Sequence, residues 1–548
     1  MVLRSGFRVT SSSSLEEVLI TSDGRTTSVT IRPARKFTLL MACCGASLLA
    51  SLATKPAEAA CTTTGNTIVC APGTAQTARI GSGPNQASGT TVTVQPNAQV
   101  TAGNTSAISL GDNATITLGA GSTVTNNATS GSGLWSAGNN TIEFGSNGTL
   151  TIAAGATVSA LGTQNNGEPI NVMGVGNVIT NYGTVTSRSG AAIWFEDRTS
   201  GGINTVDNYG VIQTLLGSNA NVIGNQNNGS VTFINRTGAR VEGSLSFASG
   251  NDHLTLEAGS VITGSFDGGG GTNTLTLGGA AGSSDSLAGD IRNFQILTKS
   301  GAGKWTLTGA VGANGGNAAL QVLVNEGTLA LTGDNANFNG SITVESIGVL
   351  EARAQSLPPT VANDGLVRFT QDTAGDYSGV ISGLGSVEKT LGGTLTLSGV
   401  NTYQGGTVIN AGTVLIAADS GLGAASGGVT INGATLGVIA DVTTARATTI
   451  TSAGGVLQAA AGTTLTHTGV VSGAGSLSKT GDGTVVLTNG NTYAGRTIIE
   501  AGVLQIGSDA NLGASTSGIL FSGGTRVWPT RSARPAQRRS TATAARST

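Results

Sequence analysis

Short runs of alternating apolar and polar residues, each closed by glycine or asparagine, fill the chain from Val94 to Gly271. The runs are rich in Thr, Val, Ile and Leu, and alternation with a period of two predicts β-strands with one buried face. Glycine and asparagine readily adopt the positive φ angles that sharp corners need. The pattern therefore predicts many short strands joined by tight corners, with almost no helix after Ala59.

A phrase built on asparagine recurs within this region at a fixed interval. Asn181, Asn208 and Asn235 are 27 residues apart, since 208 − 181 and 235 − 208 both equal 27. Such an interval predicts one coil of a parallel β-solenoid, in which equivalent residues stack about 4.8 Å apart. One coil cannot bury its own apolar face, so its neighbours must supply the core. Stacked asparagines are expected to share amide hydrogen bonds along the axis.

A longer repeat follows, and its copies begin at Lys299, Lys389 and Lys479, which are 90 residues apart. Each lysine opens a glycine-rich turn and a short Thr/Leu/Val strand, although Leu391 replaces the first glycine of the second copy. The second and third copies continue in parallel through Asn-Thr-Tyr at residues 401–403 and 491–493. Self-similarity at a fixed interval is typical of stacked repeat units.

The composition agrees with a solenoid and argues against nucleic acid or an anionic membrane as a partner. The 548 residues include 86 Gly and only 10% charged residues, against roughly 7% Gly and about 25% charged residues in average proteins. Low charge together with 38% apolar residues argues against wholesale disorder, and 10 prolines without a period exclude collagen. A net charge of −2 gives no electrostatic reason to expect a nucleic-acid partner or an anionic membrane.

The N-terminal region reads as an export signal. Arg32, Arg35 and Lys36 precede an apolar run from Phe37 to Ala53, and small residues lead to an expected cleavage after Ala59. Residues 1–59 are therefore predicted to be an extended signal peptide, unless translation starts further in, near Val29. Export would place the mature chain in an oxidising compartment.

Four cysteines are present. Cys43 and Cys44 lie in the apolar part of the signal and would leave with it, whereas Cys61 and Cys70 remain as one close pair. In an exported chain such a pair predicts a small N-terminal disulfide. A metal site is the alternative, but no second cysteine pair or nearby histidine supports it.

The last residues break the pattern. From 526 to 548 the chain contains six arginines, no Asp or Glu and no alternation, just after Ile519 had begun another coil. An abrupt change within a strand is more typical of a shifted reading frame than of a designed tail. A basic arm that binds nucleic acid or a membrane is the alternative.

The Lys-x-Gly-x-Gly phrase, followed by Asn-Thr-Tyr-x-Gly and Ala-Gly-Thr-Val, resembles the autotransporter-associated β-strand repeat, and the upstream Asn-Tyr-Gly coils are similar to autotransporter passenger sequence. The resemblance covers about residues 94–525. It implies a signal peptide, a right-handed parallel β-helix as passenger, and an outer-membrane β-barrel translocator in the same chain. The repeat is associated in that family with export and folding. No barrel sequence follows residue 525, so we expect a truncated or frame-shifted product that would be periplasmic as written.

Candidate catalytic residues are few. His253 and His467 lie in different repeats, and Ser284-Asp285-Ser286-Leu287 only approaches the Gly-Asp-Ser-Leu esterase motif. Residues 301–304, Gly-Ala-Gly-Lys, precede Trp305 and a strand, so they predict a turn rather than a phosphate-binding loop. No catalytic residue is therefore predicted.

Two further segments contain acidic or metal-binding residue types. Glu196 and Asp197 are adjacent, and adjacent strand residues point to opposite faces, so they cannot flank one glycosidic bond without an intervening turn. The segments 250–256 and 270–277 approach a calcium-binding repeat, but the second has Asn273 where a carboxylate is needed. No metal and no cofactor are therefore predicted.

The sequence as a whole predicts an all-β, parallel β-helical passenger with four parts: a signal at 1–59, a β-helix at 60–296, repeats at 297–525 and an aberrant tail at 526–548. Its expected role is structural or adhesive, at the outer membrane, the cell surface or the extracellular space. A host cell, an extracellular matrix or another copy of the chain would be its partner. A secreted β-helical enzyme acting on polysaccharide and a non-functional truncated product are the alternatives.

Overall fold

The computed structural model describes residues 7–12, 15–22, 25–31, 61–73, 75–82, 88–129, 140–163, 167–196, 201–226, 229–288, 291–311, 320–333, 335, 338 and 340–527. The apolar run of the predicted signal and residues 528–548 of the tail lie outside these ranges. The chain divides into two compact units, Met1–Glu58 and Ala59–Thr548. In the first, three antiparallel strands form a small sheet: β1 (Phe7–Ser12), β2 (Leu15–Ser22) and β3 (Arg25–Ile31).

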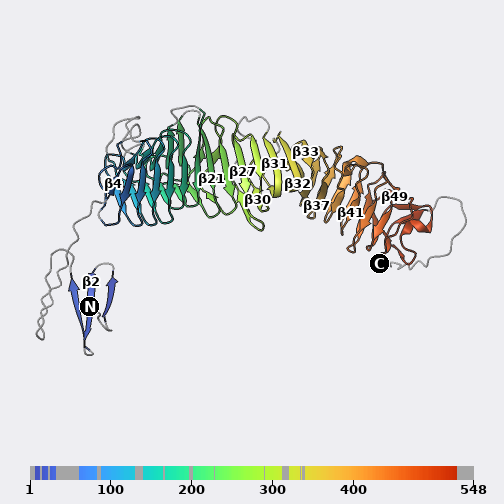
Figure 1. The fold of residues 1–548 in the computed structure, drawn as a ribbon. Coiled ribbons are helices and arrows are strands. Elements are labelled where there is room, and N and C mark those ends of the chain that lie inside the picture. Colours follow the sequence, from blue (N-terminus) through green and yellow to red (C-terminus); the bar gives the residue numbers. More distant parts are fainter. Residues whose placement is uncertain are drawn as a thin grey trace, which may run out of the picture. The chain divides into compact units, whose positions relative to one another are not determined.

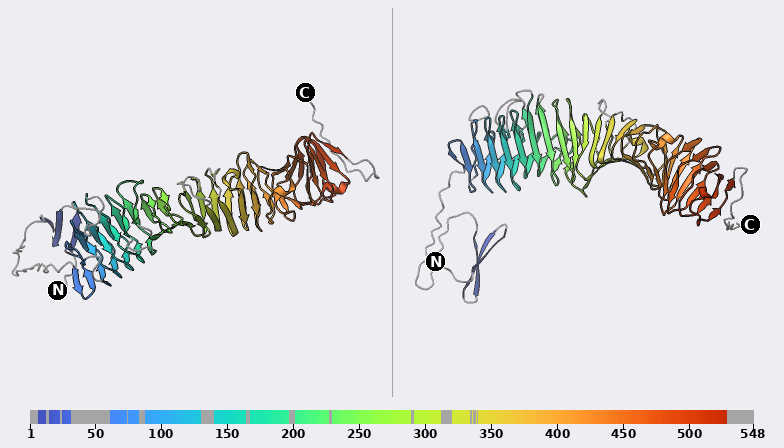
Figure 2. Two further views of the ribbon diagram at one scale, coloured as in Figure 1. Left: turned by 90° about the horizontal axis from the view of Figure 1, so that it is seen from above. Right: turned by 45° about the vertical axis from the view of Figure 1, so that its right-hand side comes forward.

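The second unit is a parallel β-solenoid of about 19 turns with almost no helix, which confirms the predicted fold class. Its coils follow one another in sequence order along the stack (Figures 1 and 2). Most coils contribute one strand to each of three sides, and in the others a turn or a short 3-10 helix takes the place of one strand. Among the described residues no helix has the length and apolar character needed to cross a membrane.

Three parallel sheets form the sides of the N-terminal coils. Side one contains β6 (Thr91–Val94), β9 (Thr115–Leu118), β12 (Thr149–Ile152), β15 (Val178–Asn181), β18 (Ile203–Asn208), β21 (Ser230–Asn235), β24 (His253–Glu257) and β27 (Thr274–Gly278). Side two contains β7 (Gln99–Ala102), β10 (Thr123–Asn126), β13 (Thr157–Ala160), β16 (Thr184–Ser187), β19 (Val211–Thr214), β22 (Arg240–Glu242) and β25 (Val261–Ile262). Side three contains β8 (Ile108–Ser109), β11 (Ile142–Phe144), β14 (Ile170–Val172), β17 (Ile193–Glu196), β20 (Ile223–Gln226), β23 (Leu245–Ser246) and β26 (Phe266–Asp267).

The C-terminal coils continue the same three sides. Side one continues as β29 (Ile296–Lys299), β31 (Gln321–Leu331), β32 (Ser341–Ala352), β33 (Thr360–Asn363), β36 (Val380–Ser382), β43 (Val442–Thr444), β46 (Thr464–His467), β49 (Thr484–Leu487), β51 (Val503–Ile506) and β53 (Thr525–Val527). Side two continues as β28 (Ser284–Leu287), β30 (Lys304–Leu307), β34 (Leu366–Thr370), β37 (Ser386–Thr390), β39 (Thr407–Ile409), β41 (Val429–Ile431), β44 (Thr448–Ile450) and β47 (Val471–Gly473), and the C-terminal halves of β31 and β32 join it.

Side three continues as β35 (Gly375–Tyr377), β38 (Thr394–Leu397), β40 (Thr413–Ile416), β42 (Thr435–Val438), β45 (Gly455–Ala459), β48 (Leu477–Thr480), β50 (Thr497–Ile499) and β52 (Ile519–Phe521). Three short 3-10 helices complete the coils: η1 (Ala354–Ser356), η2 (Asp419–Leu422) and η3 (Asp509–Leu512). The last two are 90 residues apart and occupy equivalent places in two repeats.

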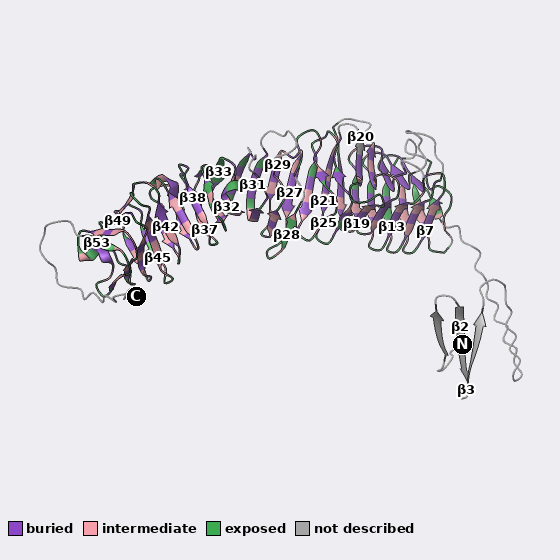
Figure 3. Cartoon of the chain, turned by 180° about the vertical axis from the view of Figure 1, so that it is seen from behind, coloured by how far each residue is buried: buried purple, intermediate pink, exposed green. Residues whose placement is uncertain are grey.

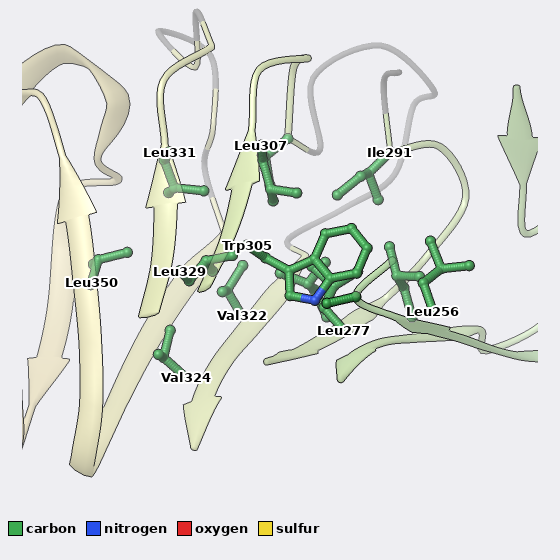
Figure 4. Packing of buried hydrophobic residues seen from close by; sticks show 14 of the residues in the cluster. Leu256, Leu277, Ile291, Trp305, Leu307, Val322, Val324, Leu329, Leu331 and Leu350 are labelled. Carbon is green, nitrogen blue, oxygen red and sulfur yellow. The ribbon is translucent and has the colours of Figure 1, made fainter. Parts of the chain in front are cut away.

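Alternation along the strands builds the core, as the sequence pattern predicts. In β13, for example, Val158 and Ala160 are buried while Thr157 and Ser159 are partly exposed, and Figure 3 shows the same alternation along the stack. Apolar side chains of successive coils point into one shared interior (Figure 4). Trp305, on β30, is 2% exposed, and its indole N–H donates to the carbonyl of Gly278 at 2.7 Å. Each coil thus supplies apolar surface that its neighbours cover.

The predicted asparagine ladder is also present. Asn181, Asn208 and Asn235 are in register, and none of them is exposed to solvent. The amide of Asn181 donates to Asn208 at 2.8 Å, and that of Asn208 donates to Asn235 at 2.9 Å. The 27-residue interval is therefore one coil, and its buried corner is held by side-chain amides along the axis.

The 90-residue interval, in contrast, is not a whole number of coils. Lys299 is followed on side one by Val324, Val344 and Asn363, and the next coil brings the chain to residue 383. Lys389 lies six residues further on, on side two. In the same way four coils lead from Lys389 to residue 473, and Lys479 lies six residues later, on side three. Each repeat spans four coils and one further side, so its copies face three different directions.

Candidate functional site

The buried lysines of the long repeat bind backbone and not a ligand. Lys299, Lys389 and Lys479 are each no more than 1% exposed. The Nζ of Lys479 donates to the carbonyl oxygens of Thr480 at 2.8 Å, Gly481 at 2.6 Å and Ala501 at 3.0 Å. Lys299 and Lys389 make the equivalent bonds in their own turns. Each ammonium group therefore closes the glycine-rich turn that follows it and ties that turn to the next coil.

Burial lowers the pKa of all three lysines, and that of Lys389 falls to about 8. The carbonyl oxygens that surround each Nζ act in the opposite direction, because they accept hydrogen bonds best from the charged ammonium group. The sequence marks the lysine as the anchor of the repeat, but its internal role is visible only in the structure.

The Asn-Thr-Tyr phrase of the repeat is internal as well. Tyr403 and Tyr493 have no exposed surface, and their hydroxyls contact those of Thr407 and Thr497, each at 2.6 Å. The side-chain amide of Asn401 similarly donates to the carbonyl of Gly421 in the following coil, and its oxygen accepts from the backbone N–H of Ile381 in the preceding coil. The lysine, asparagine and tyrosine of the repeat therefore stabilise the coils from within, whereas Thr402 and Thr492 are exposed.

The candidate catalytic residues are not brought together. His253 lies on β24 and His467 on β46, many coils apart, and the His467 ring is buried against Thr448 at 2.8 Å. Ser284–Leu287 forms β28, where the Asp285 carboxylate accepts from the backbone of Gly259. Gly301, with φ +72°, begins a turn into β30, as predicted. None of these groups shares a site with another.

The two segments that resemble a calcium-binding repeat, 250–256 and 270–277, form hydrogen bonds between neighbouring coils. Asp252 and Asn273 are fully buried, and Asp252 accepts from the backbone of Val231 at 2.7 Å, while Asn273 accepts from that of Asp252 at 2.8 Å. Burial raises the pKa of Asp252 to about 6. Within the described ranges no group of three or more His, Cys, Asp or Glu side chains is placed to hold a metal ion.

Carboxylates do meet on side three, but in a combination that the sequence did not indicate. The predicted pair is not observed as such, since Asp197 lies outside the described residues. Glu196 instead accepts from the amide of Asn171 on the neighbouring coil, at 3.2 Å. Nearby Glu168 is 7% exposed, and burial together with the charge of Glu196 raises its pKa to about 8.

Glu143 continues this group one coil earlier. It is in register with Asn171, is fully buried, and accepts from the hydroxyl of Ser109. Reaching Glu143 or Glu168 from solvent would require the coils to open. Strand alternation alone could not predict the burial of Glu143, which alternates with the core residues Ile142 and Phe144, or that of Glu168, which precedes β14.

Cys61 and Cys70 are joined by a disulfide in the structure. They close an antiparallel hairpin of β4 (Cys61–Thr64) and β5 (Thr67–Cys70), and β5 pairs in parallel with β6. The hairpin therefore covers the N-terminal edge of the first sheet. Cys43 and Cys44 lie outside the described residues.

The described part of the chain concentrates exposed apolar side chains on a few coils. Fifteen large apolar side chains are exposed there, and seven of them fall between residues 161 and 216. We call these seven the exposed patch; they are Leu161, Val178, Tyr182, Ile203, Tyr209, Leu215 and Leu216. Their side chains project from the corners and outer faces of the coils that contain β13, β15, β16, β18 and β19. They lie at three corners of adjacent coils: Val178 and Ile203 at the start of side one, Tyr182 and Tyr209 at its end, and Leu161, Leu215 and Leu216 at the end of side two. Exposed apolar side chains this close together in the coils favour contact with a partner.

An aromatic stack forms one edge of the exposed patch. The rings of Tyr182 and Tyr209 lie 4.6 Å apart between centroids with an interplanar angle of 18°, and the Arg236 guanidinium lies 5.4 Å from the Tyr209 centroid. Arg236 also binds Asp207 at 2.7 Å and Glu257 at 2.8 Å. These contacts raise the pKa of Arg236 further above its usual value. The stack is thus a partly exposed aromatic surface whose one cation is paired with two carboxylates.

Comparisons with known proteins identify the repeat. A family model described as passenger-associated-transport-repeat matches residues 297–317, 325–352, 387–416 and 477–506. The chain is also 34% identical over 225 residues to the adhesin BmaC autotransporter of Brucella suis biovar 1 (strain 1330). That match covers 39% of this chain and 6% of the relative, so the chain spans a small part of that protein's length.

No solved structure matches the chain. The family model and the adhesin relative nevertheless agree with the solenoid and with the lysine-anchored repeats seen here. The chain thus carries passenger-associated transport repeats in its C-terminal part and is similar to part of an autotransporter adhesin.

Proposed function

We propose that this passenger acts as a structural and adhesive element of a bacterial surface protein. The observation that carries the proposal is the exposed patch, because a rigid solenoid that gathers seven exposed apolar side chains on adjacent coils offers a surface for binding. The printed name of the relative, an adhesin, supports the same role. Similarity to passenger sequence also implies export to the cell surface or beyond it, with an outer-membrane translocator in the same gene product.

We further propose that the passenger works without catalysis. The carboxylates that a polysaccharide-cleaving enzyme would need are Glu143, Glu168 and Glu196, and the first two are 0% and 7% exposed. A glycosidase places two carboxyl groups on either side of an accessible sugar bond. Glu143 accepts hydrogen bonds from Ser109 and from the amide of Asn140, so it stabilises the coil and is not placed to contact a substrate.

Bead attachment tests the adhesive role. Beads coated with the purified full chain should attach to epithelial monolayers or to immobilised matrix proteins more than beads coated with albumin. The double variant Leu215→Ser/Leu216→Ser should attach several-fold less, because both side chains are more than half exposed within the exposed patch. Leu384→Ser/Val400→Ser is the matched control, with two equally exposed side chains outside that patch.

Attachment at the level of albumin would contradict the adhesive role itself. Equal losses in both double variants would instead show that adhesion is not located in the exposed patch. Circular dichroism of each variant would verify that the solenoid is intact.

A further inference from the structure

The tyrosine stack belongs to a column of corner residues that succeed one another along the axis. The backbone N–H of each corner residue donates to the coil before it: Ala153 to Leu118, Tyr182 to Ile152, Tyr209 to Asn181 and Arg236 to Asn208. The corner column therefore reads, in order, Gly119, Ala153, Tyr182, Tyr209, Arg236 and Glu257. The last four residues of the column have planar or charged side chains that contact one another, whereas the first two, Gly119 and Ala153, are small.

The aromatic stack ends abruptly at Tyr182. One face of this ring is covered by Tyr209, yet the residue is 45% exposed. Because the two rings stack along the axis, the other face of Tyr182 points toward the preceding coil. That coil turns through residues 153–156, which are Ala, Ala, Gly and Ala. The free face of Tyr182 thus stands above a turn with no large side chain.

The surroundings of this free face offer hydroxyl groups and no unpaired cation. Thr151 and Thr180 are in register on the outer face of side one, two residues before Ala153 and Tyr182. Neither hydroxyl makes a hydrogen bond within the described part of the chain, so both can donate to and accept from a ligand. The charges nearest the stack are Arg236 and its partners Asp207 and Glu257, which together carry a net charge of −1 and leave no unpaired cation.

We propose that this corner is a binding site for a neutral oligosaccharide, with one pyranose ring packed on the free face of Tyr182. The apolar C–H face of a pyranose would cover the aromatic ring, and its hydroxyls would meet Thr151 and Thr180. A tyrosine presents this contact at low entropic cost, since its ring is held by the Tyr209 and Arg236 stack. The inference rests on the proposed adhesive function and names the chemistry of the ligand.

The structure favours this ligand over a charged one or a second copy of the chain. An acidic glycan would need an unpaired cation, and Arg236 is already bound to two carboxylates. A second protein surface would favour a continuous apolar face, whereas Val178 and Tyr182 are separated on their strand by the outward-facing Thr180. Apolar faces alternating with hydroxyls complement a sugar ring.

The test uses the full chain and soluble probes: cellohexaose, maltohexaose and mannohexaose as neutral ligands, and a galacturonic acid hexamer as an acidic one. Isothermal titration calorimetry should detect binding of at least one neutral hexamer. Tyr182→Ala should weaken that binding at least tenfold, while Tyr182→Phe should retain it because the ring remains. Leu384→Ala removes a more exposed apolar side chain elsewhere and should change nothing.

A second variant keeps Tyr182 and blocks the space above it. Ala153→Tyr adds a ring at the next position of the corner column, so it should extend the stack, leave the fold intact by circular dichroism and abolish sugar binding. Failure of every neutral hexamer to bind, or binding unchanged in Ala153→Tyr, would overturn the proposal. Binding of the acidic hexamer alone would overturn it too, as would self-association that Tyr182→Ala removes.

The adhesive role can fail separately. If beads coated with wild-type chain attach to cells and Tyr182→Ala beads attach equally well, the sugar site is wrong and the adhesive function stands. If wild-type beads do not attach while a neutral hexamer binds through Tyr182, the sugar site stands without the cellular role.

Discussion

At the scale of single residues, polar groups inside the solenoid decide how the coils respond to conditions. Glu168 is the clearest case, because burial raises the pKa of its carboxyl group to about 8 from an ordinary value near 4.5. The folded chain therefore binds this proton more tightly than the unfolded chain does. Stability from this group is fully present below pH 4.5 and is lost as the pH rises through 8.

Glu168→Gln should flatten this dependence. Between pH 5 and pH 8.5 the wild-type chain should lose on the order of a few kcal/mol of unfolding free energy at this site, and the variant should not. Urea denaturation followed by circular dichroism at both pH values measures the difference. Asp252, whose pKa is also raised, is unchanged in the variant and serves as the internal reference. Parallel pH profiles for the two proteins would refute the role of Glu168.

Leu391 carries backbone strain that the sequence already hints at. It stands where the other copies of the repeat have Gly301 and Gly481, and like them it has a positive φ, +64°. Its side chain is 49% exposed, so little packing would be lost with it. Leu391→Gly should therefore stabilise the chain by up to about 1 kcal/mol, as relief of left-handed strain exceeds the entropy cost of glycine.

The exposed Leu384 provides the opposite control. It does not have a positive φ, so Leu384→Gly should cost about 0.5–1 kcal/mol through backbone entropy alone. Thermal melts should show a higher melting temperature for Leu391→Gly and a lower one for Leu384→Gly. A lower melting temperature for Leu391→Gly would contradict the strain at this turn.

At the scale of strands and turns, the sequence predicted some relations well and missed others for a physical reason. Alternation predicted the strands. The 27-residue interval predicted the asparagine ladder through Asn208, because equivalent residues in that region are one coil apart. The 90-residue interval indicated stacked repeat units, but it could not show that the copies lie on different sides, since coil length varies and four coils do not fill the interval. The exposure of Tyr182 was equally hidden, because it depends on the small residues that happen to occupy its corner one coil earlier.

The buried lysines show what such turns require. The Nζ of Lys389 donates to four carbonyl oxygens, those of Gln371, Thr390, Leu391 and Ala411. Lys389→Met preserves the stem and leaves these acceptors without a donor, which should cost about 2–5 kcal/mol. Arg353→Met, in an exposed ion pair, should cost about 1 kcal/mol or less. Equal urea midpoints for the two variants would show that the ammonium group is dispensable.

At the scale of the whole solenoid, stability is a sum of contacts between neighbouring coils, so an unprotected end is the weak point. The N-terminal end is covered by the hairpin of β4 and β5, which the Cys61–Cys70 disulfide closes over a separation of nine residues. An exposed edge strand is a template for pairing with other chains. The disulfide therefore protects the stack from its first coil.

Replacing both cysteines with serine should open this end first. Loss of the short closed loop should destabilise the hairpin by roughly 2–3 kcal/mol. Amide hydrogen exchange should then rise in β6 and β9, next to the hairpin, while the coils around β45 exchange as before, because each coil contacts only its neighbours. The freed edge of β6 should also let chains associate, which sedimentation velocity would detect. Uniform exchange along the stack would instead mean that the solenoid unfolds as one cooperative unit.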